Sequence, residues 1–211
     1  MNITIFGGTG QTGLLVIEKA LAAGHNVTVF ARTPAKISVK SENLTIIKGE
    51  LSELNNIERA VKDADAVISV LGPTKDTKGL VIADGVKNII SAMEKNEVKR
   101  LIATATPGFK DSSDRFQFSF SFAVFMIKTL MKNSYQNIVE TGNNIAKSSL
   151  DWTIVRLPML SNNPASGNIY AGYIGDKNVK LFSLSRPDLA DFLLQQIEDT
   201  KYLHASPVIS N

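Results

Sequence analysis

The chain contains no cysteine and only two histidines, His25 and His204, in 211 residues. Disulfides, thiolate catalysis and cysteine-ligated metal are therefore excluded, because each needs a thiol. A histidine-rich metal site is excluded by the histidine count, so we expect no metal ion. His25 falls in a turn between two expected elements, where a structural role is expected, and His204 receives no role.

Long apolar runs and a strong excess of one charge are also missing. The most apolar stretch, around Phe118–Met131, is interrupted by Ser119, Ser121, Lys128 and Thr129, so we expect no membrane span. The net charge of +3 is small and scattered, which argues against nucleic acid as a partner. The first residues run directly into a glycine-rich motif without a signal-peptide pattern, so we expect a cytoplasmic protein.

Short apolar runs alternate with longer helical patterns along the chain. Strands are expected at Ile3–Phe6, Val27–Phe30, Leu44–Ile47, Ala66–Val70, Leu101–Thr104 and Thr153–Val155. Helices are expected at Gly10–Ala23, Leu54–Lys62, Lys78–Lys95, within residues 114–148, and at Pro187–Ile197. This alternation predicts an α/β fold, a doubly wound parallel sheet with helices on both faces. We expect one domain over residues 1–211, with a small substrate-side lobe from about Ser161.

Three glycines, Gly7, Gly10 and Gly13, follow the first expected strand and open the first helix. In this context the spacing is typical of a Rossmann-type dinucleotide site. The first glycine permits a tight turn, the second lets backbone approach a pyrophosphate, and the third allows close packing of helix on strand. The helix N-terminus offers N–H groups to the phosphates. Further donors in this turn are Thr9, Gln11 and Thr12.

The second expected strand lacks the acidic residue with which NAD enzymes usually bind the ribose 2′-hydroxyl. Arg32 stands in its place, and Lys36 follows four residues later. A guanidinium and an ammonium suit a 2′-phosphate, so the sequence predicts NADP(H) as cofactor. The alternative interpretation, a solvated loop cation, carries more weight for Lys36 than for Arg32.

These motifs resemble the atypical short-chain dehydrogenases/reductases, in the group that includes biliverdin reductase B-like flavin reductases and NmrA-like NAD(P)-binding proteins. The resemblance rests on segments spread over most of the chain: Phe6–Gly13, Val29–Arg32, Asp65–Ile68, Val70–Gly72, Trp152–Pro158 and Ser185–Ala190.

The resemblance also implies roles for residues outside the glycine turn. It places Glu50 and Leu51 near the adenine, Leu71, Gly72 and Pro73 along the cofactor, and Pro158 with Met159 and Leu160 on the nicotinamide side. It places Thr106 after the fifth strand, where relatives often carry a serine near the nicotinamide. Thr106 is therefore the candidate catalytic residue.

The chain departs from typical members, which carry Tyr-x-x-x-Lys on one helical face. Tyr135 is followed four residues later by Val139, so the pair is absent in the expected region. Tyr173 and Lys177 match the spacing, but the intervening Gly175 and Asp176 predict a turn. Where biliverdin reductase-like members carry a histidine beside the proline, this chain has Met159.

These observations predict an NADPH-dependent reductase of a flavin or another planar, conjugated acceptor. The alternative is a non-catalytic redox sensor of the NmrA-like type that acts through a partner protein. We expect a monomer or a homodimer. The phenylalanine-rich segment Phe116–Phe125 is interpreted first as a helix packed on the core, with an aromatic lid and a dimer interface as the other interpretations.

Overall fold

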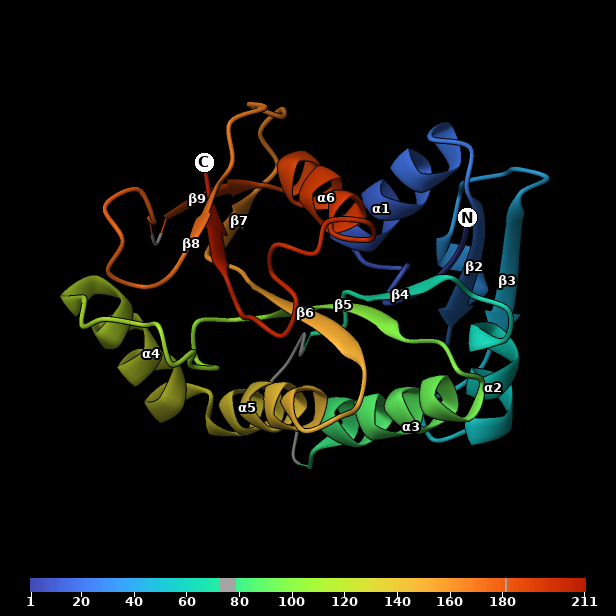
Figure 1. Cartoon of the computed structure of the whole chain (residues 1–211), viewed down its shortest axis with the longest axis horizontal. Coiled ribbons are helices and arrows are strands. Elements are labelled where there is room, and N and C mark those ends of the chain that lie inside the picture. Colours follow the sequence, from blue (N-terminus) through green and yellow to red (C-terminus); the bar gives the residue numbers. More distant parts are fainter. Residues whose placement is uncertain (73–78, 181) are drawn as a thin grey trace.

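The computed structural model describes residues 1–72, 79–180 and 182–211 and centres on an eight-stranded sheet (Figure 1). The strand order is β3-β2-β1-β4-β5-β6-β10-β8, and β8 is antiparallel to β10 whereas the other neighbouring pairs are parallel. The strands are β1 (Asn2–Phe6), β2 (Asn26–Ala31), β3 (Leu44–Lys48), β4 (Ala66–Ser69), β5 (Arg100–Ala105), β6 (Asp151–Arg156), β8 (Tyr170–Gly172) and β10 (Val208–Ser210). The predicted Rossmann-type α/β fold is confirmed.

Helices cover both faces of this sheet (Figure 1). They are α1 (Gln11–Ala22), α2 (Leu54–Val61), α3 (Val81–Lys95), α4 (Phe118–Leu130), α5 (Lys132–Ala146) and α6 (Arg186–Gln195), with a short 3₁₀ turn at Pro34–Lys36. Ile5 of β1 faces the core under α1 and α6, whereas its neighbour Phe6 faces the core under α2, α3 and α5. Successive strand residues point to opposite faces, so β1 is buried on both faces from Ile3 to Phe6.

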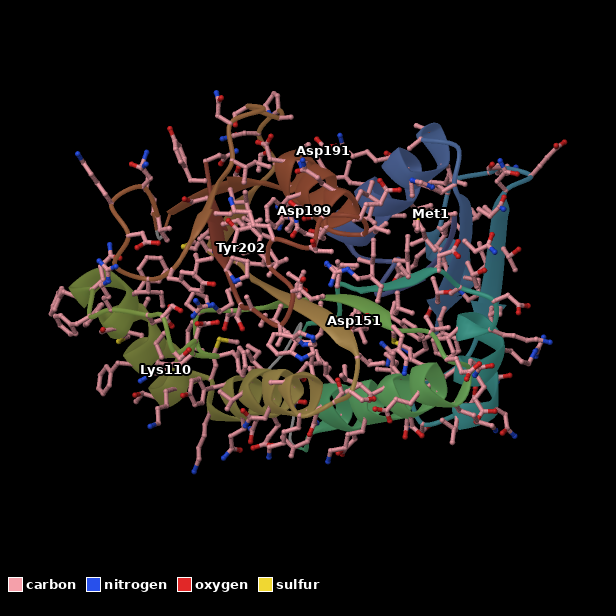
Figure 2. The ribbon with its side chains drawn as sticks, viewed as in Figure 1. Met1, Lys110, Asp151, Asp191, Asp199 and Tyr202 are labelled. Carbon is pink, nitrogen blue, oxygen red and sulfur yellow. The ribbon has the colours of Figure 1, made fainter. Side chains whose placement is uncertain are left out.

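The two helices on one face, α1 and α6, are also joined at the surface. Lys19 of α1 forms an ion pair with Asp191 of α6 at 2.7 Å, and Figure 2 labels Asp191 on the outer side of α6. Both side chains are partly exposed, so this pair contributes at most about 1 kcal/mol. The two helices are therefore held on the sheet mainly by burial of their apolar faces.

The C-terminal part of the chain divides between two sheets. Strands β8 and β10 extend the main sheet, whereas β7 (Met159–Ser161) and β9 (Phe182–Ser185) form a separate two-stranded parallel sheet. The Tyr202 hydroxyl donates a hydrogen bond to the Ala171 carbonyl at 3.1 Å, which holds β8 against the segment before β10. The lobe expected from about Ser161 is therefore separate only in part: β7 and β9 form their own sheet, whereas β8, α6 and β10 belong to the main sheet and its core.

The region expected to hold helix between residues 114 and 148 contains two helices, α4 and α5. The first interpretation of its phenylalanines, packing on the core, is wrong for most of them. Phe120 is buried, but Phe118, Phe122 and Phe125 are 73%, 55% and 61% exposed. A helical spacing of apolar residues shows that they share a face, and it does not say whether that face points inward.

Within the described residues, no helix is long and apolar enough to cross a membrane. The same residues contain no cluster of three or more side chains of the kinds that commonly hold a metal ion.

Candidate dinucleotide-binding site

The turn between β1 and α1 is built on glycines that its own backbone requires. Gly7 has φ of +86°, and a Cβ there would lie 2.8 Å from the Val70 carbonyl oxygen. A Cβ on Gly13 would collide with the Gly7 carbonyl oxygen. A side chain at either position would therefore push α1 away from the ends of β1 and β4.

Gly10 differs from both of these glycines. Its backbone is extended, with φ of −83° and ψ of 163°, and among the described residues a Cβ would meet only the Gly7 carbonyl oxygen, at an ordinary 3.5 Å. Gly10 is exposed, so nothing in the packing of the described chain requires a glycine there. An open backbone of this kind suits a ligand that lies directly on it.

The first turn of α1 presents unused donors beside Gly10. Leu14 makes the first intrahelical hydrogen bond, donating to the Gly10 carbonyl at 2.9 Å. The N–H groups of Gln11, Thr12 and Gly13 find no partner among the described residues, and the turn carries no acidic side chain. Such a helix start favours a phosphate. Thr9 and Thr12 are half-buried beside it, and Gln11 is exposed.

Arg32 directly follows β2, next to the glycine turn in the sheet order, because β2 pairs with β1. Lys36 closes the 3₁₀ turn Pro34–Lys36. Both side chains are exposed, and neither makes an ion pair or a side-chain hydrogen bond within the described part of the chain. The two cations are thus available to an external anion.

Glu50 and Leu51 follow β3 at the same edge of the sheet. Glu50 is exposed, and its N–H donates to the Glu53 carboxylate at 3.1 Å. Hydrogen bonds from Asn56 and from Glu50 lower the pKa of Glu53. Leu51 packs against Gly85 of α3, where a Cβ would lie 2.7 Å from the leucine side chain. Leu51 therefore anchors the loop, whereas Glu50 faces outward.

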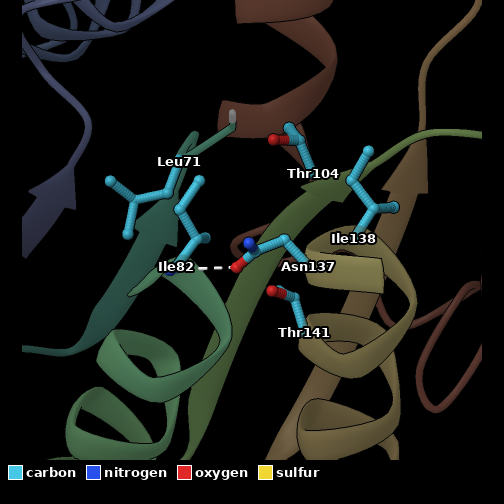
Figure 3. Close-up of a pocket in the computed structure, with 6 residues that line it drawn as sticks. All are labelled: Leu71, Ile82, Thr104, Asn137, Ile138 and Thr141. Atoms are coloured by element: carbon cyan, nitrogen blue, oxygen red, sulfur yellow. Dashed lines mark hydrogen bonds between the residues drawn. The ribbon is translucent and has the colours of Figure 1, made fainter. Parts of the chain in front are cut away.

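Leu71 and Gly72 follow β4, and Pro73 lies outside the described residues. Leu71 lines a cavity of about 10 Å³ with residues of α3, β5 and α5 (Figure 3). That volume suits one water molecule and no substrate. Gly72 is exposed, and a Cβ there would meet no atom of the described residues within 4 Å.

Asn137 of α5 fixes the far end of this loop. Its Oδ1 accepts hydrogen bonds from the N–H groups of Ile82 and Ala83 at 3.1 and 3.3 Å, and its Nδ2 donates to the Gly79 carbonyl at 2.6 Å. Figure 3 shows its side chain reaching from α5 to the start of α3. Asn137 is 3% exposed, so this cap is buried. Sequence reasoning missed it, because the cap comes from a helix more than fifty residues away.

Thr106 follows β5 and is half-buried. Its hydroxyl accepts a hydrogen bond from the Gly108 N–H at 3.3 Å, and a Cβ on Gly108 would lie 3.2 Å from the Tyr135 ring. The Lys128 ammonium of α4 lies 6.0 Å from the centre of that ring. The fold thus brings a threonine, a tyrosine and a lysine to one end of β5, although the sequence lacks the i, i+4 spacing.

The other tyrosine–lysine match lies in a turn, as predicted. Tyr173 accepts a hydrogen bond through its carbonyl from the Asp176 N–H at 3.0 Å, and Gly175 has φ of +96°. Burial and the nearby Asp111 carboxylate raise the pKa of Tyr173. Tyr173 and Lys177 therefore do not share a helical face.

The residues expected to contact a dinucleotide thus lie just beyond the carboxyl-terminal ends of six parallel strands, β1 to β6. The glycine turn follows β1, where the strand order changes direction between β1 and β4. Ligands of open α/β sheets bind at this topological switch point. Pro158 lies buried after β6, and Met159 beside it is 64% exposed at the start of β7.

A protein-family model described as NAD(P)H-binding matches residues 7–200 of the chain. The chain belongs to this family. An isoflavone reductase homolog of Solanum tuberosum is 26% identical over 96% of the chain, and the match covers 66% of that relative. The chain thus spans about two-thirds of the length of this curated relative.

Two solved structures share the fold of this NAD(P)H-binding protein. One is a short-chain dehydrogenase/reductase from Veillonella parvula in complex with NADP, with a TM-score of 0.79, 20% identity and coverage of 100% of this chain and 94% of the other. The other is ChuY, an anaerobillin reductase from Escherichia coli O157:H7, with a TM-score of 0.79, 18% identity and coverage of 100% and 97%.

The residues of this NAD(P)H-binding protein fit a nicotinamide dinucleotide. The open face at Gly10, the unpaired N–H groups of α1 and the free cation Arg32 lie along the route that such a ligand takes across the sheet edge.

Arg156, the last residue of β6, forms an ion pair inside the molecule. Arg156 is fully buried and binds both carboxylate oxygens of Asp114, at 2.6 and 2.7 Å. Its Nε also donates to the Ser206 carbonyl at 2.6 Å. Burial alone raises the pKa of Asp114, but hydrogen bonds and the charge of Arg156 outweigh it, so the pKa is lowered. This pair fixes the loop after β5 that carries Thr106.

Proposed function

We propose that this protein is an NADPH-dependent reductase that transfers hydride to a flavin or another planar, conjugated acceptor. The observation that carries the proposal is the exposed Arg32 directly after β2. No carboxylate stands there to bind the ribose 2′-hydroxyl, and the guanidinium suits a 2′-phosphate. The name of ChuY, an anaerobillin reductase, supports a conjugated acceptor.

The bound cofactor would supply the hydride in this chemistry. The protein binds and orients the cofactor and the acceptor and shields them from water. The turn around Gly10 and the start of α1 hold the phosphates, while Arg32 selects the 2′-phosphate. Thr106 and Met159 border the acceptor side at the ends of β5 and β6. A reduced flavin takes protons readily from water, so no dedicated acid is required, and the Thr106 hydroxyl is the protein's own donor there.

The test is a screen of NADPH oxidation against flavins, quinones and tetrapyrroles. Tyr173→Phe and Lys177→Ala should leave turnover within a few-fold of the unmodified protein, because both residues belong to a turn. Thr106→Val should cost less than the roughly 10²–10⁴-fold loss that follows removal of an essential general acid. A collapse of kcat in Tyr173→Phe, with cofactor binding intact, would restore a tyrosine acid and overturn the mechanism.

A second candidate is a redox sensor that binds the dinucleotide without turnover. The observation that favours it is Val139, which stands on α5 where a catalytic lysine would follow Tyr135. Absence of NADPH oxidation with every acceptor, together with dinucleotide-dependent binding to a partner protein, would favour the sensor.

A further inference from the structure

Helix α4 exposes apolar side chains that the proposed reaction does not use. Phe118, Phe122 and Phe125 project into solvent, while Phe120 packs inward. The rings of Phe118 and Phe122 stack with centres 6.2 Å apart. Figure 1 places α4 at the end of the molecule away from β3, where its described neighbours leave this face open. We call Phe118, Phe122, Phe125 and Thr129 the outer stripe.

The exposed apolar area around the outer stripe is large for a lone molecule. Other apolar side chains of the same segment are also exposed: Phe116, Met126, Leu130 and Met131. With about 150–250 Å² per aromatic side chain, Phe116, Phe118, Phe122 and Phe125 alone expose roughly 400–700 Å² of mostly apolar surface. Patches on monomers rarely exceed about 600 Å², whereas a standard interface takes about 800 Å² from each partner. The area therefore suits one complete protein–protein interface.

The outer stripe is also symmetric along the helix. Its four residues are separated by four, three and four positions, so the spacing reads the same in both directions. A two-fold axis between Phe122 and Phe125 maps the stripe onto itself. Such self-complementarity is what an isologous dimer needs, and two-fold dimers are the commonest oligomers.

Charge selects the antiparallel arrangement. Residues 115–139 contain Arg115, Lys128 and Lys132 and no acidic residue. A parallel pair would place Lys128 against its own copy, whereas the antiparallel pair separates the two lysines by about 13 Å along the helix axis, given a rise of 1.5 Å per residue. That separation exceeds the screening length of about 8 Å at physiological salt.

We propose that the outer stripe of α4 is the interface of a homodimer, in which two copies of α4 pack antiparallel with Phe122 of each copy against Phe125 of the partner subunit. The inference is independent of the proposed reaction, because it rests on exposed area, spacing and charge. A dimer of this kind would also cover the exposed phenylalanines of a segment that contains five phenylalanines and lies at one end of the molecule.

Sedimentation of the full chain over a range of concentrations tests the dimer. The unmodified protein should dimerise, and Phe122→Ser/Phe125→Ser should raise the dissociation constant at least a hundredfold with unchanged circular dichroism. The control Leu54→Ser removes a comparable exposed side chain at the start of α2 and should leave the dimer unchanged. A monomer at every concentration, or a dimer indifferent to the double substitution, overturns the proposal.

Cysteine cross-linking tests the direction, and the natural absence of cysteine makes each introduced thiol unique. In the antiparallel pair, two copies of residue 122 are offset by about 5 Å along the helix, and two copies of residue 118 by about 16 Å. A disulfide requires Cα atoms within about 7 Å. Phe122→Cys should therefore cross-link and Phe118→Cys should not.

Equal cross-linking at both positions would mean a parallel pair and overturn the arrangement. Two further results would give the outer stripe a different role and would overturn the proposed dimer. One is a monomer that sediments with phosphatidylglycerol vesicles and loses that binding in Phe122→Ser/Phe125→Ser. The other is a monomer whose acceptor KM rises in the same variant, as a lid over the acceptor would require.

Discussion

We expect the choice between NADPH and NADH to depend on Arg32. Its guanidinium is exposed after β2 and has no partner within the described residues. Arg32→Ala should weaken NADPH binding by roughly tenfold to a hundredfold, because one charge-assisted phosphate contact contributes about 1.5–3 kcal/mol. NADH binding should change little. Calorimetry with both dinucleotides measures the effect, and Lys62→Ala, another exposed cation at the end of α2, is the control. Equal affinities in the unmodified protein would refute the claim.

Gly10 and Gly13 make a matched pair, because one is open and the other is crowded. Gly10→Ala should weaken dinucleotide binding with little loss of stability, since a Cβ there meets one atom of the described structure, at 3.5 Å. The larger Gly10→Val should abolish binding. Gly13→Ala should destabilise the fold itself, because its Cβ collides with backbone of the same turn. Thermal unfolding and calorimetry separate the two effects. If Gly10→Val still binds the dinucleotide, the phosphates lie elsewhere.

At the scale of an element, α6 holds a distant loop through the carboxylate of Asp188. This side chain is 1% exposed and accepts hydrogen bonds from the N–H groups of Ser166 and Gly167 at 2.9 and 3.0 Å. The Ser185 hydroxyl donates to it at 2.6 Å and accepts from the Asp188 N–H at 3.1 Å. The two contacts with Ser185 cap the start of α6. The contacts with Ser166 and Gly167 attach the loop before β8 to the same carboxylate.

Asp188→Asn should therefore loosen that loop as well as the helix. Removing the charge from this set of hydrogen bonds should lower the free energy of unfolding by about 1.5–3 kcal/mol. Amide exchange over residues 162–169 should accelerate more than exchange in β1. Asp191→Asn, on the exposed side of the same helix, should cost at most about 1 kcal/mol. Unchanged exchange in the loop would show that other contacts hold it.

At the scale of the whole molecule, stability should fall in acid through Asp114 and Asp188. Hydrogen bonds lower the pKa of both carboxyls, despite burial that acts in the opposite direction. A lowered pKa gives stability that is present above the unfolded value of about 3.9 and is lost as pH falls through the folded value. The melting temperature should therefore drop between about pH 4 and the lower folded values.

Asp114→Asn tests the larger of these contributions. At neutral pH it should cost about 3–5 kcal/mol, because the buried Arg156 loses its charged partner. Its melting temperature should also depend less on pH below 4 than that of the unmodified protein. Glu58→Gln, which breaks the partly exposed pair with Lys95, is the control and should cost at most about 1 kcal/mol. An unaltered acid profile in Asp114→Asn would assign the acid sensitivity to other groups.

The sequence predicted the overall architecture because buried parallel strands and amphipathic helices each give a characteristic pattern of apolar residues along the chain. The bounds and pairing of the short strands β7, β8, β9 and β10 were not predicted, since three or four residues are too few to show a period. The outward direction of the α4 phenylalanines was also hidden, because spacing defines a face and only packing gives it a direction. Lys128 beside Tyr135 escaped notice because the two residues belong to different helices.

The place of β10 in the sheet has a consequence for biosynthesis. Residues 208–210 are translated after all the other described strands, yet β10 lies between β6 and β8, and β8 pairs with no other strand in the described structure. A nascent chain that lacks these residues exposes an edge of β6 and leaves β8 unpaired. Such open edges attract other strands, so we expect prematurely terminated chains to be aggregation-prone and to be substrates for chaperones and proteases.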